Sequence, residues 1–225
     1  MNPDTAAHRR RPWRVHDLAP DFELLDLWRL PVHVDEAHGQ TFEDFHRVFL
    51  RLGISLRARP VYPLAPRSAA DCLYLARLAA LAGLVGLRLM LGRVFRLDVD
   101  PGRGRGRDMP DRFVAARLTD ADRARERGPA PAASRDAFGF RPVYAFEHEA
   151  LHEVSNRTVH ALLHLSLVPD GPEAGAVLLA VYVKSRGPMT RFYLGLIRPF
   201  RFAVVYPALL EHVGRTWRHV TIPPR

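Results

Sequence analysis

The sequence is poor in several residues that usually define a protein's class. Cys72 is the only cysteine and Lys184 the only lysine among 225 residues, so 32 of the 33 basic side chains are arginine. A single cysteine excludes an intrachain disulfide framework and fits a reducing compartment. Hydrophobic residues make up 48% and charged residues 25%, which excludes a disordered or collagen-like chain. The length fits one large domain better than two.

The sequence also lacks a secretory signal and a clear membrane span. The basic cluster at 9–11 is not followed by an apolar segment, so we expect residues 1–20 to form a flexible basic tail before a single domain at 21–220. Residues 68–92 are the most apolar stretch, but Arg77 and Arg88 lie inside it. Each would cost about 2.5–3.5 kcal/mol at a bilayer centre. We therefore expect a buried or peripheral helix there and a cytoplasmic protein, with peripheral attachment to the inner membrane as the alternative.

The charge balance permits two kinds of anionic partner. The net charge is +9 and the sequence pI about 10.6, which suits nucleic acid or an anionic membrane surface. Acidic residues are interleaved with the arginines, which favours arginines spread over the surface. The loop at 99–111 carries alternating Gly and Arg but no aromatic residues for base stacking. It also lacks the GxGxxG pattern of dinucleotide sites. Nucleic acid is therefore an unlikely partner, whereas an anionic membrane surface remains a candidate.

Periodicity predicts a mixed α+β chain in the first half. Residues 22–32 suit a strand that ends at Pro31, and residues 41–52 suit a helix capped by Thr41 and stopped by Gly53. Ser68 can cap the helix at 68–92. Further expected segments are strands at 93–98 and 112–119 and an exposed insertion at 120–137.

The second half has clearer patterns. A strand starts within 140–149, and residues 157–168 and 176–185 alternate as strands with one buried face. Residues 189–218 form a long helix with an apolar stripe and a basic face. Pro199 and Pro207 should kink it or divide it.

Several chemical motifs favour ordinary structural roles. His148 and His152 complete an HExxH pattern, but zinc binding by that motif needs a helix and these residues lie between strand-like segments. His160 and His164 are expected on a solvated outer face, as are Glu147 and Glu149. Cys72 is expected to be an inert core thiol. The sequence indicates no metal and no cofactor.

Four segments together resemble a known family. They are DFELLDLWRLPV (21–32), LHEVSNRTVHALLHLSLVP (151–169), VYVKSRG (181–187) and IRPFRFAVVYPALLEHVGRTW (197–217). They resemble an uncharacterised bacterial domain of the START-like, or SRPBCC, superfamily, which also occurs fused behind dehydrogenase-like epimerase domains. The resemblance implies a helix-grip fold, in which a curved antiparallel sheet wraps round a long C-terminal helix with a cavity between them. It implies no catalytic residues.

We therefore expect binding of a hydrophobic or amphipathic small molecule between the sheet and the C-terminal helix. Alternation and helix phase suggest a set of lining residues, with plain core packing as the alternative role for all of them. An enzyme on the same fold, such as a cyclase, hydrolase or isomerase, would use His148, provided that this side chain faces the cavity. A peripheral membrane protein is the third possibility. The candidate ligand-binding residues are Tyr144, Phe146, His148, Arg157, Tyr193, Ile197 and Phe200.

Overall fold

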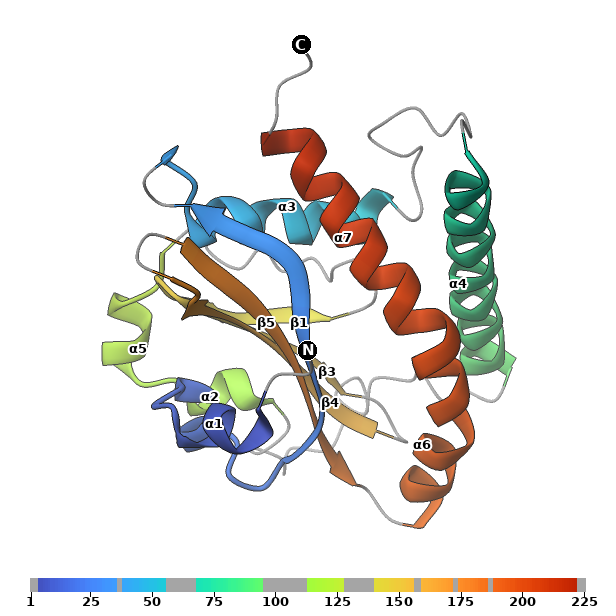
Figure 1. Cartoon of the computed structure of the whole chain (residues 1–225). Helices are drawn as coiled ribbons and strands as arrows, with labels where there is room; N and C mark the ends of the chain where they lie inside the picture. The colour runs from blue at the N-terminus through green and yellow to red at the C-terminus, as the bar shows by residue number, and fades with distance from the viewer. Residues whose placement is uncertain are drawn as a thin grey trace.

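A computed structural model describes residues 4–35, 38–55, 68–94, 113–127, 140–155, 159–171, 174–185 and 188–221. Figure 1 shows a curved sheet with helices on both sides. Its strands are β1 (Glu23–Asp35), β2 (Arg141–Ala145), β3 (Glu149–Ser155), β4 (Val159–Pro169) and β5 (Ala174–Ser185). They pair antiparallel in the order β1-β5-β4-β3-β2. The predicted α+β class is confirmed, with an antiparallel sheet packed against a long C-terminal helix as in a helix-grip arrangement.

Strand β1 continues past Pro31, where the sequence suggested that it ends. The pairing with β5 is irregular between Arg29 and His33, and β1 lies at the edge of the sheet. An edge strand tolerates proline because the missing N–H is not needed for a second ladder. Val32 and Val34 after the irregularity are buried, so the strand keeps its place over the core.

The two capped helices begin where their caps predicted. Helix α3 (Phe42–Ser55) follows Thr41, whose hydroxyl accepts a hydrogen bond from the Asp44 N–H at 3.1 Å. Helix α4 (Ala69–Val94) follows Ser68, whose hydroxyl accepts from the Asp71 N–H at 3.2 Å. Helix α3 passes through Gly53, and α4 includes residues 93 and 94 of a predicted strand. The rest of that strand and the loop at 99–111 lie outside the described residues.

The predicted strand at 112–119 is wrong in its described part. Val114–Arg117 form a 3-10 turn, η3, and Asp120–Ala124 form helix α5 after a capping box between Thr119 and Asp122. The Val114 N–H donates to the Glu153 carboxylate at 2.8 Å. This backbone group is thus satisfied by a side chain, and no neighbouring strand is required. Of the expected insertion at 120–137, residues 128–137 lie outside the described chain.

The N-terminal segment, expected as a flexible tail, contains two short helices that pack on the sheet through a few buried residues. It forms α1 (Thr5–Arg10) and α2 (Arg14–Leu18), with Asp4 capping α1. His8, Val15 and Leu18 are buried. The segment is polar and has few apolar residues, so its sequence alone carries too little periodicity to predict a docked helix.

The C-terminal helix is divided as its prolines predicted. Helix α6 (Pro188–Phe200) leads into a π-helical turn, η4 (Arg201–Val205), and then α7 (Tyr206–Thr221). The Tyr206 N–H donates to the Arg201 carbonyl, and Pro207 has no N–H to continue the α-helical ladder. Gly214 permits close contact between α7 and β1, because a Cβ there would lie 3.2 Å from the Pro31 carbonyl oxygen.

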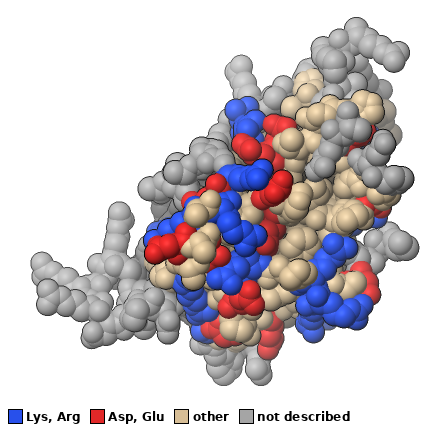
Figure 2. All heavy atoms as spheres, turned by 90° about the vertical axis from the view of Figure 1, so that its left-hand side faces the viewer, with Lys and Arg blue, Asp and Glu red and all other residues tan. Residues whose placement is uncertain are grey.

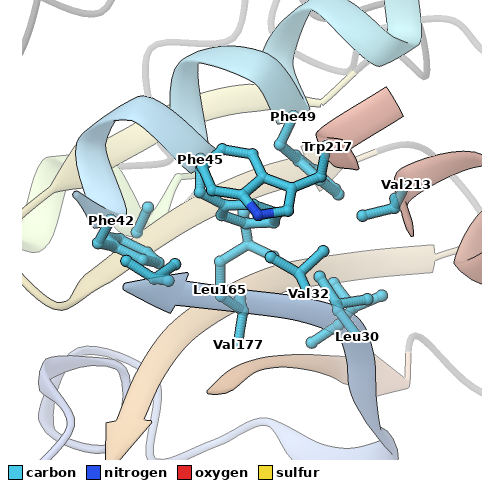
Figure 3. Close-up of a cluster of buried hydrophobic side chains, with 12 residues drawn as sticks. Leu30, Val32, Phe42, Phe45, Phe49, Leu165, Val177, Val213 and Trp217 are labelled. Atoms are coloured by element: carbon cyan, nitrogen blue, oxygen red, sulfur yellow. The ribbon is translucent and has the colours of Figure 1, made fainter. Parts of the chain in front are cut away.

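The sheet is buried on both faces. The side that meets α3 and α7 is here called the helical face, and the side that meets α1, α2 and η3 the N-terminal face. Strand β4, predicted to bury one face, presents Leu165 to the first and Leu162 to the second. Figure 3 shows phenylalanines of α3 and Trp217 of α7 packed together over the strands of the helical face. The labelled residues of this core are Leu30, Val32, Phe42, Phe45, Phe49, Leu165, Val177, Val213 and Trp217.

Helix α4 packs beside α7 in Figure 1. Across the described residues, no helix combines the length and the apolar character needed to cross a membrane. The expectation that residues 68–92 do not form a span is thus met for the part of the chain that the structure describes.

Candidate functional site

Glu149 is the centre of a buried polar cluster on the N-terminal face. Its carboxylate accepts hydrogen bonds from His164 Nε2 and from the Tyr144 hydroxyl, both at 2.9 Å. The backbone N–H of Arg14 donates to its two oxygens at 3.1 and 3.2 Å. Burial by itself would raise the pKa of Glu149, but the hydrogen bonds from His164, Arg14 and Tyr144 outweigh burial and lower it. The cluster therefore holds an ionised carboxylate that connects α2 to the sheet.

Two histidines of the N-terminal segment share the hydroxyl of Tyr182. His16 Nδ1 donates to the Arg11 carbonyl at 3.1 Å, so in the neutral ring Nε2 accepts from Tyr182 at 3.0 Å. The Tyr182 oxygen then accepts from His8 Nε2, also at 3.0 Å. Burial, followed by the nearby His164 and His16, lowers the pKa of His8 to about 3. The docked segment thus requires His8 to be uncharged.

The predicted solvent exposure of His160 and His164 is wrong. They are 4% and 0% exposed, because η3 and the N-terminal segment cover their side of the sheet. His160 Nε2 donates to Glu153 at 2.6 Å. Glu149 is likewise buried, whereas Glu147 is exposed. Alternation correctly placed both histidines on one face but did not reveal what covers that face.

A hydrogen-bonded carboxylate and imidazole are also the parts of an acid–base pair. Here the ring of His164 lies beneath those of His8 and Trp13, with centroids 5.6 and 5.7 Å away. A substrate would reach it only after α1 had left the sheet. We therefore interpret the Glu149 cluster as the docking site of the N-terminal helices.

The HExxH residues are separated, as the sequence suggested. His148 is exposed in the turn between β2 and β3, and His152 is buried against α3, where it shares a 2.9 Å hydrogen bond with His46. Among the described residues, no group of three potential ligands is placed to hold a metal ion. Since His148 faces solvent, the enzymatic hypothesis that depended on it loses its candidate residue.

Two expected ligand-lining residues lie away from the C-terminal helix. Tyr144 and Phe146 are buried and stack at 4.4 Å between ring centroids. Both belong to the core of the N-terminal face, on the other side of the sheet from α7. A bulge in β2 after Pro142 contributes to this placement, and the sequence pattern gives no sign of it.

The remaining expected residues lie on or near α6. Ile197 is half-buried and Phe200 is 52% exposed. Tyr193 belongs to α6, but its side chain lies outside the described part, as does Arg157 entirely. The structure therefore does not bring the seven expected residues together at one site.

A different group meets where η4 crosses β1 at the edge of the helical face. The Tyr206 hydroxyl donates to Asp26 at 2.5 Å, and Arg201 Nη1 lies 3.4 Å from the same carboxylate oxygen. The ring of Trp28 lies 4.6 Å from that of Tyr206 and 5.7 Å from that of Phe202. Burial, with the Asp26 hydrogen bond, raises the pKa of Tyr206. We call these five residues the junction site.

Two buried hydrogen-bond donors of the junction site are unsatisfied, because no described residue accepts from them. Arg201 Nε is buried and has no hydrogen-bond partner in the described part of the chain. The Trp28 indole N–H, on the ring that lies beside Tyr206, is also buried and has no hydrogen-bond partner among the described residues. Buried polar groups are rarely left in this state. The sequence carried one signal for this site, since Asp26 interrupts an apolar strand two residues before the inward-facing Trp28.

The outer surface next to α1, α2 and α5 carries both charge signs. Figure 2 shows Lys and Arg side chains interleaved with Asp and Glu on this side. Arg14 pairs with Asp122 at 2.8 Å, and Arg127 lies 3.5 Å from Glu147. The Arg14 hydrogen bond lowers the pKa of Asp122 to about 2, against the effect of burial. The arginines described on this side are therefore largely compensated.

The fold and these sites define an α+β protein with both sheet faces covered and a divided C-terminal helix. The family described as protein of unknown function (DUF2867) matches residues 18–208, and the chain belongs to it. The match runs from the end of α2 into α7 and includes the five described strands and the junction site. Searches of curated proteins and of solved structures found no match.

Proposed function

We propose that this protein is a member of the START-like superfamily that binds an amphipathic small molecule with an acidic group. The ligand would lie between the sheet and the C-terminal helix, at the junction site. The observation that carries this proposal is the pair of buried, unsatisfied hydrogen-bond donors on Trp28 and Arg201. They lie beside Phe202, which is 43% exposed.

The junction site has the two kinds of group that such a ligand needs. A ligand carboxylate would accept hydrogen bonds from Arg201 Nε and Trp28 Nε1, and the bond from Arg201 would be charge-assisted. Leaving a buried donor unpaired costs about 1–3 kcal/mol, so a ligand that accepts these bonds removes that cost. The apolar part of the ligand would cover Phe202 and Ile197, which contributes about 25 cal/mol per Å² before the costs of association.

The rest of the helical face favours the junction site over a central cavity. Phe45 and Trp217 fill the space between α3, α7 and the strands, with ring centroids 5.7 Å apart. The Trp217 indole N–H is satisfied by the His33 carbonyl at 3.0 Å. The centre therefore offers neither an unpaired donor at Trp217 nor an exposed aromatic ring.

Native mass spectrometry of freshly purified protein tests the proposal, with binding of anilinonaphthalene sulfonate as an anionic amphipathic probe. We expect a co-purified acid of discrete mass that is released on denaturation, or binding of the probe. Trp28→Phe keeps the ring and removes one donor, which should weaken binding about fivefold to a hundredfold. Trp13→Phe is the matched control, because its indole N–H is also buried and unpartnered among the described residues, but on the N-terminal face.

Two results would contradict the proposal. One is the absence of both a co-purified molecule and probe binding. The other is binding that Trp28→Phe and Arg201→Met leave as strong as in the parent protein, since the ligand would then lie elsewhere.

A further inference from the structure

We infer that helix α1 is a flap over the buried pair of Glu149 and His164, and that the flap opens when the histidines that hold it take up protons. The flap consists of residues 4–13, from the cap of α1 to Trp13. The ring centroids of His8 and Trp13 lie 5.6 and 5.7 Å from that of His164, so these two rings cover it. The flap and the junction site lie on opposite faces of the sheet, so the inference goes beyond the proposed function and does not depend on it.

Helix α1 has a single buried side chain. Among its six residues this is His8, whose Nε2 donates to the Tyr182 hydroxyl oxygen at 3.0 Å. The ion pair of Arg10 with Asp4 joins two exposed side chains and does not reach the sheet. A helix of this length is not stable by itself in water. The folding of α1 therefore depends on the contact that His8 makes.

Helix α2 is held more firmly, by contacts that do not titrate near neutral pH. The Arg14 guanidinium donates two hydrogen bonds to Asp122 of α5, at 2.8 and 2.9 Å. The pKa of Asp122 is lowered to about 2 by Arg14, so this pair stays charged. Val15 and Leu18 are buried. Helix α2 should therefore loosen less than α1, which places the hinge of the flap between the two helices.

The hydrogen bonds around Tyr182 require both histidines to be neutral. His16 Nδ1 donates to the Arg11 carbonyl, so the neutral ring accepts the Tyr182 hydroxyl proton at Nε2. A proton added at that Nε2 removes the acceptor, and the Tyr182 hydroxyl proton loses its partner. A proton added to His8 goes to Nδ1, which is buried and has no partner among the described residues. Either protonation therefore weakens the docked state.

The groups around the two rings do not reverse this effect. Burial is the largest cause of the lowered pKa of both His8 and His16. Nearby carboxylates favour the charged form of His16 but do not outweigh burial. The released chain thus binds protons that the docked chain does not, so acid favours the open flap. The groups that face the rings are His164 of β4, Glu149 of β3, Tyr182 of β5, and Arg9, Arg11 and Asp17 of the N-terminal segment.

Opening the flap would expose a pair arranged as a general base. Glu149 accepts the Nε2 proton of His164, so the neutral ring has its lone pair at Nδ1. This atom is buried and has no partner among the described residues. A carboxylate that fixes the tautomer of an imidazole is a common arrangement for proton transfer. The family match begins at residue 18, so the pair lies inside the matched residues and the flap outside them.

Carbethoxylation of the full chain at about pH 7.5 tests whether the flap covers His164. Diethyl pyrocarbonate modifies accessible neutral imidazoles, and peptide mass spectrometry locates each modified histidine. Tyr182→Phe removes the hydroxyl that both docking histidines share, so it should speed the modification of His164 at least about fivefold. His152, equally buried but on the helical face, is the internal reference. Tyr74→Phe is the matched control, because it removes a buried 2.7 Å hydrogen bond between α4 and a histidine of α7.

Hydrogen exchange at about pH 7.5 and about pH 5.5 tests the response to protons. Protection is measured against the unfolded chain at the same pH, and α1 should be less protected than α7 at both. The pKa of His8, about 3 when docked and 6.5 when released, should by itself lower the protection of α1 about tenfold over this range. His8→Gln with His16→Gln should remove this change. His46→Gln, at a buried position on the helical face, should leave it as in the parent.

Three outcomes would overturn the inference. The first is modification of His164 that Tyr182→Phe leaves as slow as in the parent, since the flap would then not depend on that hydroxyl. The second is modification of His152 in step with His164, which would mean that the whole protein unfolds. The third is protection of α1 that is equal at the two pH values, or that still changes in the double variant. None of these results bears on ligand binding, which Trp28→Phe tests separately.

Discussion

On the helical face, Leu165 and Val177 meet phenylalanines of α3 and Trp217 of α7. The next residues in the same strands point to the opposite face. There, His164 and Glu149 face α1 and α2. Both faces exclude solvent by apolar packing, and the N-terminal face adds a buried network of hydrogen bonds around Glu149. Because neighbouring residues of a strand point to opposite faces, one set of strands supports both.

This difference shows which interactions hold the helices of each face on the sheet. Apolar burial is non-directional and tolerates small shifts of α3 and α7. The N-terminal helices depend in addition on defined donors and acceptors, such as the Arg14 N–H on Glu149 and the His8 ring on Tyr182. Removing one partner of such a network leaves another buried group unpaired, which is costly. The N-terminal face should therefore be the more specific layer.

The largest expected effect is on the helical face. Phe45 is fully buried between Phe49 and Trp217. Phe45→Ala should lower the free energy of unfolding by about 3–5 kcal/mol through lost burial and a cavity. Urea denaturation measures this loss. Phe200→Ala, at an exposed position, should change stability by about 0.5 kcal/mol or less. Equal losses from the two variants would mean that the helical face is not a packed core.

A smaller loss of folding stability is expected when the residue at the centre of the polar network is replaced. Glu149→Ala leaves the His164 and Tyr144 donors buried without an acceptor, which should cost about 3 kcal/mol. Glu147→Ala is the control, because Glu147 is exposed and should contribute about 0.5 kcal/mol or less. Urea denaturation gives both values, and hydrogen exchange should locate the Glu149→Ala effect in α1 and α2. Loss of protection in α3 and α7 alone would argue against separate layers.

The change in folding stability that each buried histidine causes as the pH falls should be smaller still. Burial lowers the pKa of His8 from 6.5 to about 3, so below pH 6.5 the unfolded chain binds a proton that the folded chain does not. Stability therefore falls as the pH drops below about 6.5, by up to about 1.4 kcal/mol per pH unit for one such group. Urea denaturation between neutral pH and about pH 5 measures the slope, which His8→Gln should reduce.

His46 and His152 supply the comparison on the other face. Burial lowers their pKa values to about 4 and about 3, so they also oppose protonation. His152→Gln should reduce the loss of folding stability at low pH without releasing α1 and α2. The stability loss that depends on His8 should instead appear as faster hydrogen exchange in those two helices. A stability that stays constant down to about pH 5 would contradict the buried neutral state of all three histidines.

The sequence predicted those elements whose signals are local. Alternation identified β4 and β5, and Thr41 and Ser68 marked the starts of α3 and α4. It did not predict the docked N-terminal segment, because Val15 and Leu18 are too few to form a pattern. The junction site also escaped prediction, since its residues come together only when β1 meets η4.

The sequence by itself determined the alternation of β4 and β5, the capping of two helices and the division of the last helix near its prolines. These depend on steric and hydrogen-bonding relations within a few residues. Only the tertiary structure decided that His160 and His164 are buried, that Tyr144 lies across the sheet from α7, and that Tyr206 meets Asp26, 180 residues away. The physical reason is that burial depends on which distant segment covers a face, and a strand's alternation does not encode that.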